Sequence, residues 1–262
     1  MEAIKKLKDG RAPGVCGITS ELLKAGGQEI AMWLHSVISE VWESAIIPTD
    51  WRKGIIVPFW KGKGDRSDCG NYRGITLLST PSKVFARILL SRIRQHLLET
   101  QRPEQSGFTP GKSTIDQILA LRLLAERRRE YRQPLFAAYV DLKKAFDSVD
   151  RRALWQVLLK RGIPCKLVEL ISALYSNTFS CVRVGTDTTD WFPVDTGVRQ
   201  GCVLAPTLFN AAVDRVMKRT MTHGSAGVSF GDEIFTDLDY ADDVVLLAET
   251  IDTLQLSLSS MD

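Results

Sequence analysis

Three aspartates, placed where buried strands are expected to end, are the residues best suited to chemistry. Asp141 follows a short apolar run, and Asp242 and Asp243 stand between two further apolar runs at 235–240 and 244–247. Adjacent strands would bring these carboxylates together and hold their backbones rigidly. Crowded anionic oxygens repel one another, so a hard divalent cation is their natural counter-charge. Two such ions about 3.5–4 Å apart serve in-line phosphoryl displacement.

The blocks of sequence around these aspartates carry more information than the acids alone. An Asp-Asp pair is also open to plain turn chemistry, because aspartate favours turns. However, residues 139–149 read YVDLKKAFDSV, residues 197–210 read GVRQGCVLAPTLFN and residues 240–243 read YADD. In order and spacing these blocks resemble the three palm motifs of reverse transcriptases.

Upstream segments extend the resemblance to the fingers motifs of non-LTR retrotransposon reverse transcriptases, over about residues 5–255. They are residues 12–18, 71–79 and 105–114. Cys16 departs from the pattern, because this family usually has aspartate there. Since Cys16 lies outside the metal centre, the departure concerns the fingers more than the chemistry.

The resemblance implies a two-metal polymerase site. Asp141 and Asp242 would bind both Mg²⁺ ions, with Mn²⁺ as an alternative metal, and Asp243 would support them. The carbonyl of Leu142 would be an additional ligand. The implied substrates are an RNA template, a DNA primer and deoxynucleoside triphosphates.

The resemblance also implies a nucleotide-binding set. Arg73 matches the fingers arginine that clamps the triphosphate, a role that suits the planar fork of guanidinium. Gln200 and Gly201 match the position that packs against the incoming nucleotide and the template base, where glycine permits close approach. Lys61 and Lys63 would assist from a glycine-rich loop, or else form part of a solvated loop.

Phe146 matches the steric-gate position, five residues after Asp141. There its ring would clash with the 2′-hydroxyl of a ribonucleotide, whereas the alternative is a core aromatic at the start of a turn. The basic run 127–129 has two interpretations, a contact to template phosphates or a solvated helix end.

Periodicity predicts mixed helices and antiparallel hairpins, an α+β fold. We expect a helix over 20–46 whose apolar stripe consists of Leu22, Leu23, Met32, Trp33, Val37, Ile38 and Val41. The other expected helices begin near residues 80, 113, 150 and 204, and the expected strands are 54–60, 135–141, 179–184, 191–194 and two within 234–247. By resemblance this is a right-hand polymerase fold, with fingers at 1–134, an antiparallel palm sheet at 135–262 and the thumb missing.

Composition limits the remaining classes. With 262 residues, 44% hydrophobic and 25% charged, the chain has ordinary globular composition, and its net charge of +3 argues for no partner by itself. Basic residues crowd the first half, which suits either a polyanion track or solvated helix faces. The five widely spaced cysteines indicate reduced thiols, and no apolar run spans a bilayer. We therefore expect a soluble intracellular protein; its compartment and oligomeric state stay open.

Two functions follow from these patterns. The first is an RNA-directed DNA polymerase domain that transfers nucleotides by a two-metal mechanism. The alternative is a catalytically inactive nucleic-acid-binding remnant of a retroelement. The retained carboxylates favour the enzyme, and the expected loss of the thumb favours the remnant.

Overall fold

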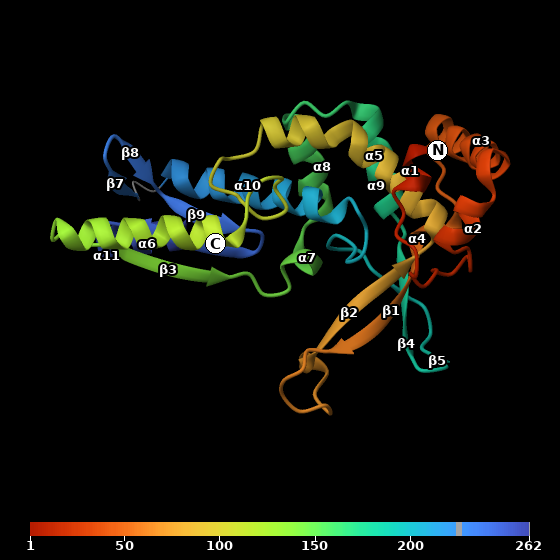
Figure 1. Ribbon diagram of the computed structural model, residues 1–262, viewed down its shortest axis with the longest axis horizontal. Coiled ribbons are helices and arrows are strands. Elements are labelled where there is room, and N and C mark those ends of the chain that lie inside the picture. Colours follow the sequence, from red (N-terminus) through yellow and green to blue (C-terminus); the bar gives the residue numbers. More distant parts are fainter. Residues whose placement is uncertain (224–226, 262) are drawn as a thin grey trace. The chain divides into compact units, whose positions relative to one another are not determined.

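The structure is a computed structural model that describes residues 1–223 and 227–261, and it divides into two compact units. The first unit comprises residues 1–95 and 146–205, and the second comprises residues 96–145 and 206–262. Neither unit is continuous in sequence. The chain therefore passes from one unit to the other within three helices: α5 (Thr80–Glu99), α7 (Ala145–Ser148) and α10 (Ala205–His223) (Figure 1).

A mixed sheet organises the first unit. Strands β1 (Lys53–Trp60) and β2 (Tyr72–Leu78) form an antiparallel ribbon, and β1 also pairs in parallel with β4 (Phe179–Val184). Two short strands, β5 (Asp187–Thr188) and β6 (Phe192–Pro193), pair with β4. Figure 1 shows β4 beside the long β1–β2 ribbon. The sequence predicts β1 and β4 but not β2, and the parallel pairing joins segments more than a hundred residues apart.

Helices surround one end of this ribbon. The apolar face of α5 is buried through Phe85, Leu89 and Ile93, and the ring of Phe85 lies 5.6 Å from that of Trp51. The remaining α-helices of the unit are α1 (Glu2–Lys5), α2 (Ser20–Ala25), α3 (Gly27–Ser44), α4 (Thr49–Arg52), α8 (Arg151–Lys160) and α9 (Cys165–Tyr175). The short helix η1 (Cys69–Asn71) lies at the other end of the ribbon, directly before β2.

The single helix expected over 20–46 is wrong, because α2 ends at Ala25 and α3 begins at Gly27. Gly27 has φ +56°, a left-handed conformation that glycine adopts easily. The expected stripe is confirmed in part: Leu23, Ile38 and Val41 are buried, whereas Leu22, Met32 and Trp33 are 60%, 49% and 59% exposed. The buried positions are Leu23, Leu34, Ile38 and Val41.

The second unit is built on an antiparallel sheet in the order β3–β10–β9. Its strands are β3 (Phe136–Asp141), β10 (Asp243–Ala248) and β9 (Asp237–Tyr240), and a separate hairpin pairs β7 (Val228–Phe230) with β8 (Glu233–Phe235). The run expected as one strand over 235–240 is therefore divided at Thr236.

Helices α6 (Thr114–Glu130) and α11 (Ile251–Ser259) pack on this sheet. Helix α6 begins at a capping box formed by Ser113 and Asp116, as serine before an apolar-periodic run predicts. Leu124 of α6 is buried in one cluster with Leu238 and Leu247 of the sheet. In the part of the chain that the structure describes, no helix is both long and apolar enough to cross a membrane.

Candidate functional site

The register of the second unit's sheet brings two of the predicted acids opposite one another. Asp141 is the last residue of β3, Asp243 is the first residue of β10, and the two are cross-strand partners. Directly opposed residues of antiparallel strands project from the same face, with Cα atoms about 4.5–5.5 Å apart. The two carboxylates therefore share one end of one face of the sheet.

Asp242 is placed differently. It is the second residue of the two-residue turn that joins β9 to β10, and its side chain is half-buried. The first turn residue, Ala241, has φ +60°, as in a type II′ hairpin turn. Asp242 is thus adjacent to the facing pair, but it is Asp243 that the register sets against Asp141.

Strand alternation explains why this end of the face is open. Along β3, Ala137, Tyr139 and Asp141 are exposed while the residues between them are half-buried. On the same face α6 covers β9 through Leu238, whereas Tyr139 at the β3 edge is 74% exposed. The buried cluster under α6 stabilises the strands, and Asp141 and Asp243 lie at the end of the face that α6 does not cover.

The chemistry of this acid pair suits a hard cation. Facing carboxylates are destabilising unless a positive charge lies between them, and oxygen ligands match Mg²⁺. The Leu142 carbonyl accepts a hydrogen bond from the Ala145 amide at 3.2 Å, which leaves its second lone pair for a ligand. Across residues 1–223 and 227–261, no group of three or more His, Cys, Asp or Glu side chains is gathered as a metal site. The fit rests on the two facing acids, their oxygen chemistry and the adjacent Asp242.

A second set of acids, not predicted from the sequence, lies on the opposite face of the same sheet. Asp239 pairs with Val244, one position along from the partners Tyr240 and Asp243, so Asp237 and Asp239 point away from the face of Asp141. Both are buried, and the Arg102 guanidinium donates to Asp237 at 2.6 and 2.8 Å and to Asp239 at 3.4 Å.

Burial, followed by the nearby charge of Asp237, raises the pKa of Asp239 to about 8. The folded chain therefore keeps a proton on the Asp239 carboxyl to a higher pH than an ordinary aspartate would. Its only sequence signal was a pair of aspartates at strand spacing just before the YADD block, in a strand whose other face is apolar.

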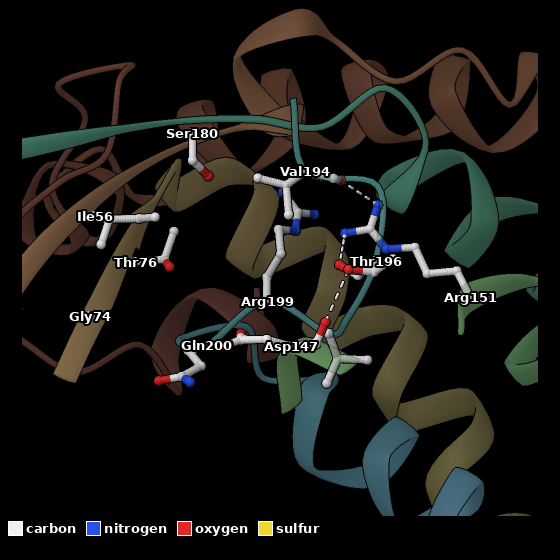
Figure 2. A pocket seen from close by; sticks show the side chains of 11 residues that line it. Ile56, Gly74, Thr76, Asp147, Arg151, Ser180, Val194, Thr196, Arg199 and Gln200 are labelled. Carbon is white, nitrogen blue, oxygen red and sulfur yellow. Dashed lines mark hydrogen bonds between the residues drawn. The ribbon is translucent and has the colours of Figure 1, made fainter. Parts of the chain in front are cut away.

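In the first unit, Gln200 and Gly201 meet the inner part of β2. A cavity of about 140 Å³ is lined by Gln200, Gly74 and Thr76. Figure 2 labels these three residues and shows the side chains of Gln200 and Thr76 together with those of Arg151 and Arg199. Gly201 has φ +99°, and an added Cβ would lie 2.6 Å from the Thr76 carbonyl oxygen. Glycine is required there by both its conformation and the approach of β2.

The two arginines that line this cavity, Arg151 and Arg199, are structural. Arg151 donates to four backbone carbonyl oxygens, those of Tyr175, Val194, Thr196 and Gly197, at 2.7–2.9 Å (Figure 2 draws two of these bonds). Arg199 donates to the carbonyls of Trp51 and Leu174 at 2.9 and 3.0 Å. Burial lowers the pKa of Arg151. Both guanidinium groups hold the loop that carries Gln200. All three nitrogens of Arg151 and both Nη atoms of Arg199 donate to backbone carbonyls, whereas the buried Arg199 Nε has no hydrogen-bond partner among the described residues.

A larger groove of about 500 Å³ in the same unit is basic and partly apolar. Gly201 and Val203 lie at its edge, and Phe59 and Ile75 expose apolar surface in it. Its charged lining residues are all cationic: Lys8, Arg11, Lys83, Arg87 and Arg183. Burial, reinforced by Arg11, lowers the pKa of Lys83. Such a lining attracts a polyanion and offers apolar surface to its bases.

The other predicted nucleotide contacts are distributed within the first unit. Arg73 is exposed on β2, one residue before Gly74, so strand alternation directs it away from the Gln200 cavity. Lys61 donates to the Gly70 carbonyl at 2.9 Å within its own loop, and Lys63 is exposed there. Phe146 is half-buried in α7, and its carbonyl accepts the Val198 amide at 2.7 Å.

Comparison with known proteins agrees with the motifs. Residues 61–262 match the family model "Reverse transcriptase (RNA-dependent DNA polymerase)". A Pol polyprotein of the type-1 retrotransposable element R2 from Nasonia vitripennis is 34% identical over 192 residues, which cover 73% of this chain and 18% of that protein.

Two further relatives have similar coverage. A probable RNA-directed DNA polymerase from transposon X-element of Drosophila melanogaster is 32% identical over 79% of this chain and 23% of its own length. An uncharacterized 149 kDa protein of transposon TX1 from Xenopus laevis is 27% identical over 97% of this chain and 19% of its own length. The chain thus spans about a fifth of the length of these relatives.

Proposed function

This chain belongs to the reverse transcriptase family, and from that premise we propose that it is the fingers and palm of an RNA-directed DNA polymerase of a non-LTR retrotransposon. The observation that carries the proposal is the register that opposes Asp141 and Asp243 at the open end of the second unit's sheet. In this proposal the antiparallel sheet is the palm of a right-hand polymerase fold.

The acids would hold the metal. Asp141 and Asp243 face one another, Asp242 completes the set from the turn, and the Leu142 carbonyl adds an oxygen. Two Mg²⁺ ions, or Mn²⁺ in their place, would lower the pKa of the primer 3′-hydroxyl and stabilise the departing pyrophosphate when bound. The rigid strands keep the carboxylates in position, so little reorganisation is needed when charge develops.

The first unit supplies residues for nucleotide and template. Gln200 lines the small cavity beside β2 and Gly201 lies at the edge of the cationic groove, where they would pack against the incoming nucleotide and the template base. Arg73 would bind triphosphate oxygens, with Lys61 and Lys63 nearby in sequence, and Phe146 would exclude the ribose 2′-hydroxyl. The cationic groove would bind phosphates of the RNA template, and the DNA primer would supply the attacking hydroxyl.

The proposal is tested by metal binding and by primer extension with the same variants. We expect Asp141→Asn and Asp243→Asn to weaken Mn²⁺ binding, followed by electron paramagnetic resonance, by about 10-fold or more, because each loses a charged oxygen ligand. On poly(rA)·oligo(dT) both variants should lose any extension that the parent chain shows.

Asp187→Asn is the matched control, because Asp187 is an exposed aspartate of the β4–β5 hairpin in the first unit. It should bind Mn²⁺ as the parent does. If Asp141→Asn binds Mn²⁺ as tightly as Asp187→Asn, the proposed metal site is wrong. A chain that binds RNA but never extends a primer would instead be the inactive remnant.

A further inference from the structure

The turn that carries Asp242 is held from outside its own hairpin by one buried side chain. The Oε1 atom of Gln105 accepts hydrogen bonds from the Ala241 amide and from the Gly107 amide, both at 2.8 Å. The Nε2 atom of Gln105 donates to the Ala241 carbonyl at 3.3 Å. Gln105 is 1% exposed, so these bonds are shielded from water.

These bonds act on the two peptide planes that flank Ala241. The Ala241 amide belongs to the peptide that follows Tyr240, and its carbonyl belongs to the peptide that precedes Asp242. Ala241 is buried and has φ +60°, a left-handed conformation that a residue with a Cβ keeps only when its surroundings impose it. A buried amide and carbonyl also need partners, and Gln105 supplies both.

The chain around Gln105 is fitted to the same hairpin. The Ser106 amide donates to the Asp239 carbonyl at 2.8 Å, and the Asp239 amide donates to the Glu104 carbonyl at 3.3 Å, so this segment lines the edge of β9. An added Cβ at Gly107 would lie 2.1 Å from the Ala241 nitrogen. The Gly107 carbonyl in turn accepts a hydrogen bond from Asn210 Nδ2 at 2.7 Å.

We propose that Gln105 is a positioning residue for the carboxylate site. Its amide fixes the turn so that β10 begins at Asp243, opposite Asp141, and so that Asp242 stands beside that pair. Gln105 touches neither metal nor substrate and acts only through the backbone of Ala241. This inference rests on the function proposed for the three aspartates.

The proposal predicts a loss of metal affinity that would not occur if Gln105 only stabilised the fold. Gln105→Met keeps the length of the side chain and removes all three hydrogen bonds. We expect faster hydrogen exchange at the Ala241 amide and an Mn²⁺ affinity about 10-fold weaker, the loss typical when a group that orients a metal ligand is removed. Both are measured on the 262-residue chain, by exchange with nuclear magnetic resonance detection and by Mn²⁺ titration.

A neighbouring glutamine provides the control. Gln101 donates to the Gln105 carbonyl at 3.1 Å and to Thr109 Oγ1 at 2.8 Å, but it bonds no described residue of the β9–β10 hairpin. Gln101→Met therefore loosens the same segment without releasing Ala241. It should leave Mn²⁺ affinity within about twofold of the parent, whereas a loss equal to that of Gln105→Met would overturn the proposal.

The outcomes separate this proposal from the proposed function. If Asp141→Asn loses Mn²⁺ binding and Gln105→Met keeps it, Gln105 does not position the site although the site exists. If neither substitution changes Mn²⁺ binding, both proposals fail. Should Gln105→Met not fold, Gln105→Glu decides: a carboxylate still accepts from both amides but repels the Ala241 carbonyl, so Mn²⁺ affinity should fall, and a parental affinity would overturn the proposal.

Discussion

At the scale of single residues, the carboxylate site depends on one hydrogen-bonding register. Asp141 and Asp243 face each other because β3 and β10 pair in that register, and a slip by one residue would turn either acid to the other face. Asp237 and Asp239 illustrate the difference, since they belong to the same sheet but point to its buried face. In this sheet, alternation along the strand decides the role of an aspartate. Asp141 and Asp243 lie on the open face and are candidate metal ligands, whereas Asp237 and Asp239 lie on the buried face and bind Arg102.

Phe146 gives the prediction that belongs to this scale. Phe146→Val should relax discrimination against ribonucleotides, because a smaller side chain would leave space for a 2′-hydroxyl. The ratio of steady-state incorporation of ribonucleotides to deoxynucleotides measures it, on a template and primer that the parent extends. An unchanged ratio in an active Phe146→Val chain would assign the ring to packing alone.

At the scale of elements, β9 combines an apolar face with a buried charged face. Arg102, Glu104 and Asp237 surround Asp239, which is 1% exposed. Because folding raises the pKa of the Asp239 carboxyl, the folded chain keeps its proton above about pH 4. The unfolded chain has released that proton above about pH 4. The stability that Asp239 contributes is therefore full below about pH 4 and is lost as pH rises through the folded pKa of about 8.

Asp239→Asn tests this pH dependence, because the amide keeps the shape of the neutral carboxyl and does not ionise. Between about pH 5 and 8, the free energy of unfolding of the parent should fall relative to that of the variant, by at most about 1.4 kcal/mol per pH unit for one group. Urea unfolding at a series of pH values measures the difference. Parallel curves for parent and variant would show that Asp239 has an ordinary pKa.

At the scale of the whole molecule, the predicted functional residues fall into two compact units, each assembled from two stretches of chain. The second unit contains Asp141, Leu142, Asp242 and Asp243, and the first contains the predicted nucleotide contacts and the cationic groove. The proposed nucleic-acid site and the proposed metal site can therefore be substituted separately. Fingers at 1–134 and palm at 135–262 remain the proposed functional division.

The groove yields the prediction at this scale. Arg11→Gln combined with Arg183→Gln should weaken binding of single-stranded RNA and lower the slope of log affinity against log salt by about 0.7 for each phosphate that is no longer neutralised. Fluorescence anisotropy between about 50 and 200 mM salt measures the slope. The pair Arg92→Gln and Arg94→Gln, exposed on α5, is the control of equal charge change, because both residues lie outside the groove and outside the basic run 127–129. Equal slopes for the two double variants would mean that the groove is not the RNA site.

The sequence by itself determined the family, the strands that end at Asp141 and begin near Asp243, and the capped start of α6. The strands and the helix start depend on residues two to four positions apart, so local patterns predict them, whereas the family follows from the order and spacing of the motif blocks. It did not predict α9 (Cys165–Tyr175), and it merged α2 and α3 because an apolar period alone does not mark a break at Gly27.

Only the tertiary structure decided which aspartate faces Asp141 and what supports the turn beside it. Three features join segments that are far apart in sequence: the register of β3 and β10, the parallel pairing of β1 with β4, and the hydrogen bonds of Gln105 to Ala241. Such pairings are selected by the packing of the whole unit, because a buried backbone group must find a partner wherever the fold provides one. The acids were therefore evident from the sequence, but their geometry was not.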